Sequence, residues 1–424
     1  MLVAIATANP SCTSDHAARD QPSGETPASQ LDAGAGEGSA CAPDPRASDT
    51  IANAGASAID EEITAALGRH HVAGVSVAVV KRGMIVFAKG YGLARPTGEP
   101  ETARSVHLIA SASKPMTAVA AMQLVEIGKL RLDEDVDVSL ADLGLRIRNP
   151  RFPTVPITLR MLLTHTASIG DSTSSFDSTW YSNGDSPISI REFVAGYFTP
   201  GSPYAGGAEA FLDHAPGTAS CYSNMGVALA SLLIERASQT SFADYCRTNI
   251  FLKLGMLDSS FRLEDQCDLS RLAYGMRHAS GQFERDDNSG VGQPEGHPEL
   301  ASGMLRTTAV DMGRFVAAMA NGGELDGARI LAPASVAEIR KRQLSPTMSA
   351  CNARVDPAEQ GLLSYYSKDA AGEYFGHAGG MNGVGTDAFF RTTDGTGFVV
   401  LGNASYDAWI NDVEVALLTH AARL

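Results

Sequence analysis

Val75-Ser-Val-Ala-Val-Val-Lys-Arg-Gly-Met-Ile-Val-Phe-Ala88 is the segment from which the architecture of this chain can be predicted. It begins with a β-rich apolar run, Val75 to Val80, of the kind found in buried strands. Lys81-Arg82-Gly83 follows as a turn, and a second run extends from Met84 to Ala88. The pattern predicts a β-hairpin. Because a lone hairpin is marginal in water, further strands are needed beside it.

Those strands are expected near the C-terminus. Three short β-like runs, broken by Gly379-Gly380 and by Thr393-Asp394-Gly395, lie at 373–378, 385–391 and 397–402. An amphipathic segment over 407–422 is predicted to close the chain as a helix. The two ends of the chain must therefore meet in one sheet.

The segments outside these strands have mostly helical patterns. Helices are predicted at 51–69, 111–127, 225–237, 309–320 and 333–343. The fold class is therefore α+β, an α/β sandwich in which helices flank an antiparallel sheet of about five strands. We assign the sheet part to about 51–128 and 365–424. An inserted, mostly helical subdomain is assigned to about 129–364.

The first fifty residues differ in composition from the rest. They are rich in Ala, Gly, Ser, Pro and Asp, and they cannot bury enough apolar surface to order themselves. We predict that residues 1–50 are a disordered tether. Met1 to Ala8 resembles the end of a signal-peptide apolar region, although the preceding basic residues are absent. We expect an exported protein, periplasmic, secreted or lipid-tethered, with a wrongly chosen start or a plain disordered tail as alternatives.

The overall composition limits the partners of the chain. Its 424 residues carry a formal net charge of -15, which repels phosphate backbones, so we expect no nucleic-acid partner. No window contains the ~18 uninterrupted apolar residues that a transmembrane segment requires. We expect a monomer that acts on a small-molecule or peptide substrate without a cofactor.

The six cysteines are scattered and include no Cys-x-x-Cys pair, standing at positions 12, 41, 221, 246, 267 and 351. Zinc-ribbon and thioredoxin-like sites therefore lack their spacing, and no metal is expected. The even number permits disulfides, and buried free thiols are equally compatible with the sequence.

Ser111 and Lys114, in Ser111-Ala112-Ser113-Lys114, are the first candidates for catalysis. Residues three apart at the start of a helix share a face, so the lysine can reach the hydroxyl. A serine becomes an effective nucleophile when a base removes its proton, and a lysine with a lowered pKa can be that base. The alternative is a helix-capping serine beside a solvated lysine.

A Tyr-x-Asn pattern occurs twice, at Tyr181-Ser182-Asn183 and at Tyr222-Ser223-Asn224. Tyrosine beside a lysine can transfer a proton, and the amide of Asn can hold a substrate carbonyl. The second copy lies between a Pro216-Gly217 turn and a predicted helix, which gives the rigid placement that this role requires. We therefore select Tyr222 and Asn224 and interpret Tyr181 as a surface aromatic residue.

His377-Ala378-Gly379-Gly380 is the third candidate element, at the end of a predicted strand. Glycines on an edge strand let a substrate backbone approach closely, and their N–H groups can donate to an oxyanion. The alternative is a strand end that turns into a loop.

Other chemistries lack support in the sequence. Gly-x-Ser-x-Gly, His-Glu-x-x-His and Gly-x-x-x-x-Gly-Lys motifs are absent. His165, in Leu162-Leu-Thr-His-Thr166, suggests a general base, but we favour a hydrogen-bonded structural histidine.

Ser-x-x-Lys, Tyr-x-Asn and His-x-Gly, in this order, resemble the motifs of the serine β-lactamase and penicillin-binding protein superfamily. The Tyr-x-Asn form is similar to the class C β-lactamase branch, which also holds D-alanyl-D-alanine carboxypeptidases, D-aminopeptidases and esterases. The resemblance covers about 51–424. It extends to Tyr91-Gly-Leu-Ala94, Leu124-Val-Glu-Ile-Gly-Lys-Leu130 with Leu132-Asp133, Leu162–Thr166, Pro216-Gly217, Gly303–Asp311 and Leu401-Gly-Asn403.

The resemblance implies a role for each residue of the first two motifs. Ser111 is the acylated nucleophile, Lys114 and Tyr222 form the proton-transfer network, and Asn224 orients the substrate amide. The family fold, a helix-flanked antiparallel sheet with a helical subdomain, agrees with the pattern of strands and helices described above.

For the third motif, the resemblance implies that His377 and Gly379 hold the substrate-binding strand. The oxyanion hole would consist of the backbone N–H groups of Ser111 and Gly380. His377 replaces the lysine of true β-lactamases, which favours peptidase-like or esterase-like members. Ala167-Ser168 replaces the usual Ser-Gly of the branch.

We therefore predict a serine hydrolase that forms a covalent acyl-enzyme with an amide, lactam or ester: a D-amino-acid peptidase or carboxypeptidase, or a β-lactamase-like enzyme. The alternatives are a carboxylesterase on the same fold and a penicillin-binding receptor that turns over slowly. Specificity is assigned to loops such as 171–215 and 279–300.

Overall fold

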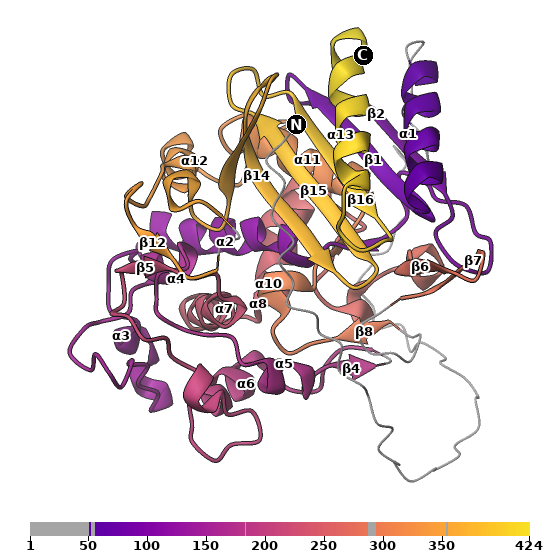
Figure 1. Cartoon of the computed structure of the whole chain (residues 1–424). Helices are drawn as coiled ribbons and strands as arrows, with labels where there is room; N and C mark the ends of the chain where they lie inside the picture. The colour runs from indigo at the N-terminus through magenta and orange to yellow at the C-terminus, as the bar shows by residue number, and fades with distance from the viewer. Residues whose placement is uncertain (1–50, 52–55, 183, 287–293, 353–354) are drawn as a thin grey trace.

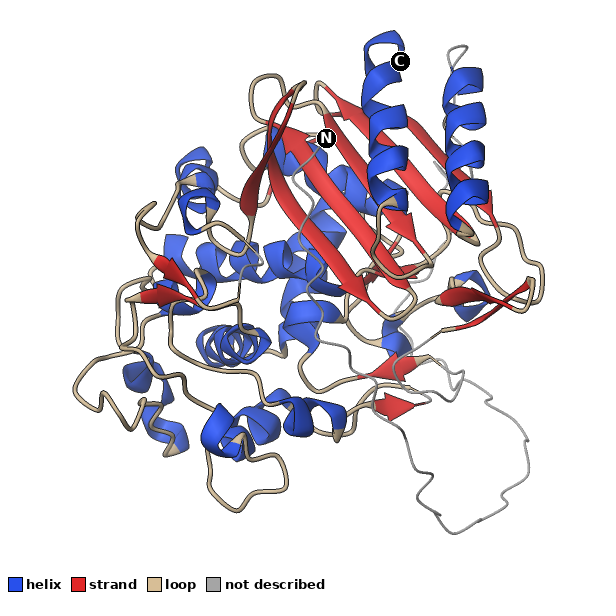
Figure 2. Ribbon diagram, viewed as in Figure 1, coloured by secondary structure: helices blue, strands red, loops and turns tan. Residues whose placement is uncertain are grey.

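The computed structural model describes residues 51, 56–182, 184–286, 294–352 and 355–424, so the predicted tether at 1–50 lies outside the described residues. A six-stranded antiparallel sheet lies at its centre, in the order β13-β14-β15-β16-β1-β2 (Figures 1 and 2). Its strands are β1 (Gly74–Lys81), β2 (Met84–Gly92), β13 (Tyr365–Asp369), β14 (Gly372–Met381), β15 (Val384–Arg391) and β16 (Gly397–Gly402).

The predicted fold class is confirmed, with one strand more than expected. The additional strand, β13, is a partly exposed edge strand with the sequence Tyr-Tyr-Ser-Lys-Asp. It is too short and too polar to give a clear strand signal. The predicted meeting of the two chain ends is also confirmed, because β1 pairs along its length with β16, from Val75 opposite Gly402 to Val80 opposite Gly397.

Helices cover both faces of the sheet, and this explains the uninterrupted apolar run in β1. Val75, Val77 and Val79 join a core cluster with α1 (Ala56–His70) and α13 (Trp409–His420), which lie side by side over one face in Figure 1. Ala78 and Val80 belong to the larger cluster, which includes α2 (Lys114–Glu126) and α11 (Ala309–Ala320).

The helix α2 links the sheet to the helical part of the molecule. Nearly all of its side chains are buried, from Lys114 to Leu124, as expected for a helix surrounded by other elements. It packs on α7 (Asn224–Ser238), whose own neighbours are α3 (Val136–Leu140), α4 (Leu159–Leu163), α6 (Ile190–Tyr197), α8 (Phe242–Cys246) and α10 (Leu300–Gly303).

The remaining elements are short. Five two-stranded sheets pair β3 (His107–Leu108) with β9 (Arg306–Thr307), β4 (Tyr181–Ser182) with β8 (Glu295–Gly296), β5 (Ala219–Ser220) with β12 (Ser349–Ala350), β6 (Met276–Ala279) with β7 (Gln282–Arg285), and β10 (Glu324–Leu325) with β11 (Ala328–Arg329). The other α-helices are α5 (Thr173–Asp177), α9 (Leu252–Leu254) and α12 (Pro333–Arg340). In the part of the chain that the structure describes, no helix is both long and apolar enough to cross a bilayer.

Several predicted boundaries are wrong: Ile51 forms an isolated bridge with Ala88 and lies outside α1, β2 continues past residue 88 to Gly92, and α12 ends at Arg340 and not at residue 343. Ser111 does not begin an α-helix: it lies in the 3-10 turn η1 (Ala110–Ser113), and α2 begins at Lys114 with Pro115 in its first turn. The strand predicted to end at residue 378 continues through Gly379 and Gly380, because these residues pair with Thr386 and Gly385 of β15. The partner strand thus compensates for the low strand propensity of glycine.

Gly402 and Gly68 offer a test of this packing. A Cβ atom at Gly402 would lie only 2.1 Å from the Trp409 ring, so we expect Gly402→Ala to lower the free energy of unfolding by about 1–3 kcal/mol. Gly68 lies in α1 with open space around it, so Gly68→Ala should stabilise the protein by about 0.5–1 kcal/mol. Urea unfolding of both variants measures the two effects, and equal midpoints would contradict the described packing of Trp409.

Candidate active site

The turn that carries Ser111 is fixed on one side by the segment that follows α10 and on the other by the sheet. The backbone N–H of Ile109 donates to the carbonyl of Leu305 at 3.0 Å, and the Thr386 hydroxyl donates to the carbonyl of Ile109 at 2.8 Å. Ala110 has a φ of 47°, a conformation that residues with a side chain rarely adopt. Such strain persists where the surroundings hold the backbone firmly, as they do here. Ser111 is consequently held half-buried at the end of a rigid loop.

Lys114 is fully buried, and its amine contacts three oxygen atoms. Nζ lies 3.0 Å from the Ser111 hydroxyl, 2.8 Å from Oδ1 of Asn224 and 2.8 Å from the carbonyl oxygen of Ser302. The amide and carbonyl oxygens can only accept hydrogen bonds, so they take up both N–H groups of a neutral amine. The Ser111 hydroxyl lies within hydrogen-bond distance of the same nitrogen, and such proximity is what a general base requires.

Asn224 is placed by the N-terminus of α7. Ser223 is the N-cap, and its hydroxyl accepts from the Gly226 N–H at 2.9 Å. The Asp171 carboxylate accepts three further hydrogen bonds here: from the Ser223 hydroxyl at 3.0 Å, from the Asn224 N–H at 2.8 Å and from the Met225 N–H at 2.9 Å. A carboxylate at a helix N-terminus satisfies otherwise unpaired donors and interacts favourably with the helix dipole.

The ring of Tyr222 is enclosed between His165 and Lys114. It stacks on the His165 ring with 4.3 Å between centroids, and Nζ of Lys114 lies 4.8 Å from its centroid. His165 also holds the backbone on either side, because its carbonyl accepts from the Cys221 N–H at 2.7 Å and its Nδ1 accepts from the Ser223 N–H at 3.2 Å. These bonds agree with the prediction of a structural histidine.

The third motif reaches the site along β14. The His377 ring is buried, 6.3 Å from the Tyr222 ring and 5.1 Å from the Tyr365 ring. A Cβ atom at Gly379 would lie 2.2 Å from the carbonyl oxygen of Ile109, so the nucleophile turn itself occupies the space that this glycine leaves. Gly380 is exposed at the end of the strand.

Glu299 is a buried acid near Lys114. It is the N-cap of α10, and its Oε1 accepts from the Ser302 N–H at 2.9 Å. Burial raises the pKa of Glu299 to about 8, although the nearby Lys114 and the Ser302 hydrogen bonds act in the opposite direction. At neutral pH this carboxyl is therefore mostly uncharged.

The structure thus brings together Ser111, Lys114, Tyr222, Asn224, His377 and Gly379, and Gly380 follows Gly379 on β14. It places Tyr181 of the other Tyr-x-Asn copy in β4, 46% exposed, while Asn183 lies outside the described residues. Asp171, Glu299 and Ser302 were not predicted from the sequence. Asp171 gives a weak signal, an acid closely following Leu162–Thr166, whereas Ser302 acts through its backbone and gives none.

One cluster among the described residues has the proximity of a metal site: His214, Cys221 and Cys351, whose ligand atoms lie within 4.8 Å of one another. The two sulfur atoms form a disulfide, and a metal ligand must be a thiolate. In this form the cluster therefore offers a metal only the imidazole. Cys246 is a buried free thiol, so disulfide-bonded and free cysteines both occur.

Comparisons with known proteins agree with this geometry. A family model described as Beta-lactamase matches residues 59–422. Penicillin-binding protein 4* of Bacillus subtilis (strain 168) is 32% identical over 197 residues, which are 45% of this chain and 38% of that protein. Esterase EstB of Burkholderia gladioli is 30% identical over 224 residues, 51% of this chain and 54% of the esterase. The chain thus spans only part of the length of these relatives.

Among solved structures, D-amino acid amidase from Ochrobactrum anthropi SV3, in complex with L-phenylalanine amide, has a TM-score of 0.68 to this chain. The match covers 88% of this chain and 99% of the amidase at 20% sequence identity. This likeness concerns the fold.

Gly379→Ala tests the contact between β14 and the nucleophile turn. The added methyl group must push Ile109 and the following residues away from the sheet, and displacements of about 1 Å cost about a hundred-fold in rate. We expect the labelling of Ser111 by a fluorophosphonate to slow by about this factor, while Gly68→Ala labels at the wild-type rate. Wild-type labelling in a folded Gly379→Ala protein would show that the turn does not depend on this contact.

Glu299→Gln tests the buried acid through the pH dependence of stability. Folding raises the pKa of this carboxyl from 4.5 to about 8, so the folded protein binds the proton more tightly than the unfolded chain. The free energy of unfolding therefore falls as the pH rises between these two values. The glutamine variant cannot ionise, so its unfolding midpoint should fall less than that of the wild type between pH 5 and pH 9. Asp311, whose pKa burial raises to about 7, contributes equally to both proteins. Identical pH profiles would contradict the assignment.

Proposed function

The chain belongs to the beta-lactamase family, and on this premise we propose that it is a serine hydrolase that forms an acyl-enzyme on Ser111. The observation that carries the proposal is the position of Nζ of Lys114, 3.0 Å from the Ser111 hydroxyl and held by two oxygens that only accept hydrogen bonds. A buried amine in this arrangement suits the removal of a proton from the nucleophile.

In the proposed first step, Lys114 takes the hydroxyl proton of Ser111 while Oγ attacks the carbonyl carbon of the substrate. The backbone N–H groups of Ser111 and Gly380 donate hydrogen bonds that stabilise the negative charge developing on the carbonyl oxygen. The leaving amine or alcohol takes a proton from the network of Lys114 and Tyr222, and the acyl-enzyme remains. Water then attacks the acyl group, and the proton that it loses passes back through the same network to Ser111.

The proposed substrates are amides or lactams built on D-amino acids, with Asn224 orienting the substrate amide and His377 and Gly379 holding the strand along which it lies. The names of the relatives support this class, since they include penicillin-binding proteins and, among structures of similar fold, a D-amino acid amidase. The presence of a histidine where true β-lactamases have a lysine favours peptidase-like over β-lactamase-like activity.

A carboxylesterase is the second candidate. The similarity to Esterase EstB, 30% identity over 224 residues, favours it directly. Both candidates use the same acyl-enzyme, so they differ only in the leaving group.

We also propose that the protein is exported. The disulfide between Cys221 and Cys351 supports this location, because such bonds persist in oxidising compartments and are rare in the cytosol.

The proposed function is tested by measuring turnover of a panel of substrates and, by intact-protein mass spectrometry, the adducts formed on Ser111. Wild-type protein is expected to release D-alanine from short peptides or to hydrolyse D-amino acid amides, with a transient adduct on Ser111, and Ser111→Ala should show neither. Turnover of nitrophenyl esters alone would favour the esterase, and a persistent β-lactam adduct would indicate a slowly deacylating receptor. Full activity of Ser111→Ala on every substrate would exclude the mechanism.

A further inference from the structure

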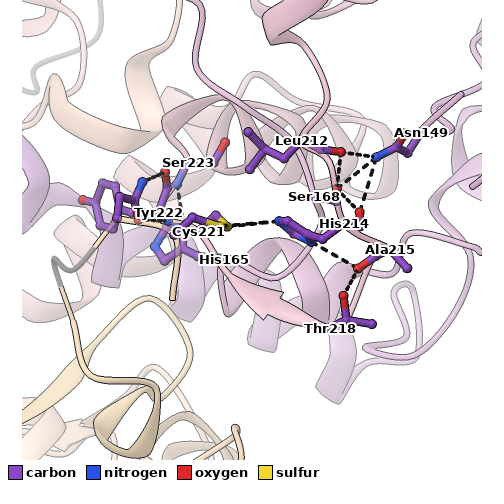
Figure 3. The surroundings of a disulfide bond; sticks show 12 residues. Asn149, His165, Ser168, Leu212, His214, Ala215, Thr218, Cys221, Tyr222 and Ser223 are labelled. Carbon is purple, nitrogen blue, oxygen red and sulfur yellow. Dashed lines mark hydrogen bonds between the residues drawn. A yellow bond between two sulfur atoms is a disulfide. The ribbon is translucent and has the colours of Figure 1, made fainter. Parts of the chain in front are cut away.

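A disulfide lies directly beside the proposed catalytic tyrosine. Cys221 precedes Tyr222 in the chain and is buried, whereas Cys351, its partner from a segment 130 residues away, is exposed. Figure 3 shows Cys221 between the Tyr222–His165 pair and His214. The disulfide therefore joins an accessible surface segment to the backbone that holds Tyr222.

The segment after β12 holds the backbone of Tyr222 through one side chain. β12 pairs in parallel with β5, and the Cys351 N–H donates to the carbonyl of Ser220 at 3.0 Å. Oδ1 of Asn352 accepts from the Tyr222 N–H at 2.7 Å, and Nδ2 of Asn352 donates to the Tyr222 carbonyl at 3.0 Å. The amide thus satisfies both backbone groups of Tyr222.

The described residues of this segment, 349–352, make few apolar contacts. Ser349, Ala350, Cys351 and Asn352 are all exposed, so they bury little apolar surface. A two-residue parallel pairing with exposed side chains is weak by itself. Within the described residues, the disulfide adds a covalent link to the hydrogen bonds by which Cys351 and Asn352 contact the backbone of Ser220 and Tyr222.

His214 is placed to assist the chemistry of the disulfide. Its Nε2 lies 3.0 Å from Sγ of Cys221 and 3.6 Å from Sγ of Cys351, as Figure 3 shows for Cys221. Its Nδ1 lies 3.2 Å from the carbonyl oxygen of Ala215, which can only accept, so Nδ1 carries a proton. Nε2 is then available to take up a proton and to pass it to a sulfur atom.

We propose that Cys221, Cys351 and His214 form a thiol–disulfide exchange site that controls the placement of Tyr222 and takes a dithiol as reductant. The effect on catalysis rests on the proposed function, whereas the exchange chemistry does not. The accessible sulfur is attacked and the buried one leaves, next to the imidazole.

The exchange proceeds in two balanced steps. A dithiol thiolate attacks Sγ of Cys351, the Cys221–Cys351 bond breaks, and the Cys221 thiolate that leaves takes a proton from Nε2 of His214. The second thiol of the reductant, as a thiolate, then attacks the mixed disulfide, which releases the Cys351 thiolate and a cyclic oxidised dithiol. Two electrons pass from the dithiol to the cysteines, and solvent returns one proton to His214 and one to Cys351. Asn352 is then free to leave the Tyr222 backbone.

The first experiment compares oxidised enzyme, enzyme reduced with dithiothreitol, and the variants Cys351→Ser and Asn352→Ala. All assays are run well below the unfolding temperature. We expect reduction and each substitution to lower kcat by about ten-fold with a smaller change in KM, because Tyr222 is displaced. Cys351→Ser should not respond further to dithiothreitol. This control is needed because Cys267 is also disulfide-bonded and is reduced in both proteins. Unchanged kcat after complete reduction, verified by alkylation of Cys221 and Cys351, would overturn the control of Tyr222.

The second experiment measures the exchange chemistry without any substrate. The rate at which dithiothreitol exposes Cys221 and Cys351 to alkylation is followed by peptide mass in wild type and in His214→Ala. We expect about ten-fold slower reduction in the variant, and equal rates would overturn the role of His214. If the wild type neither turns over a substrate nor labels at Ser111, the proposed function fails, while this rate still decides the exchange site.

Discussion

The antiparallel pairing of β1 with β16 is the constraint on which the rest of this structure depends. It joins strands from opposite ends of the chain, and Asn403 reinforces it by accepting from the Gly74 N–H at 2.8 Å and donating to the carbonyl of Leu93 at 2.7 Å. In the sheet that results, β14 and β15 lie against the turn that carries Ser111, and the Thr386 hydroxyl donates to the carbonyl of Ile109. The third motif, on β14, reaches the Ser111 turn through the sheet that this pairing completes, whereas the first two motifs meet where α2 packs on α7.

Lys114 contacts both the turn beside the sheet and the helical part of the molecule. A lysine with no exposed surface is rare, and its burial is tolerable only when its N–H groups find acceptors. The acceptors come from three separate segments, at Ser111, Asn224 and Ser302. The same contacts therefore serve the packing and the chemistry, because a displacement of any of the three segments would leave a buried polar group unsatisfied.

The sequence was enough to predict every strand of the sheet except β13 and to select the motif residues, but not to find the residues that support them. Ser111 and Lys114 could be paired because their spacing acts over one turn, and Tyr222 could be chosen over Tyr181 because a turn and a helix surround it. Ser302 contributes a backbone carbonyl, which no side-chain pattern reveals. The pairing of Cys221 with Cys351 depends on the fold, and β14 continues through its glycines because β15 lies beside it.

The arrangement around Lys114 also explains how a proton can move in a buried site at small cost. Among the oxygen atoms of Ser111, Asn224 and Ser302 that lie 2.8–3.0 Å from Nζ, only the Ser111 hydroxyl can both donate and accept. When the amine is neutral, the hydroxyl donates to its lone pair; when the amine is protonated, the same oxygen accepts. Asn224 and Ser302 keep their hydrogen bonds in both states. Glu299, whose pKa burial raises to about 8, adds no full negative charge at neutral pH that would hold the proton on the lysine. In the proposed mechanism the Ser111 hydroxyl can therefore change from donor to acceptor while Asn224 and Ser302 keep their hydrogen bonds, and this preorganisation requires the rigid backbone that surrounds Ser111.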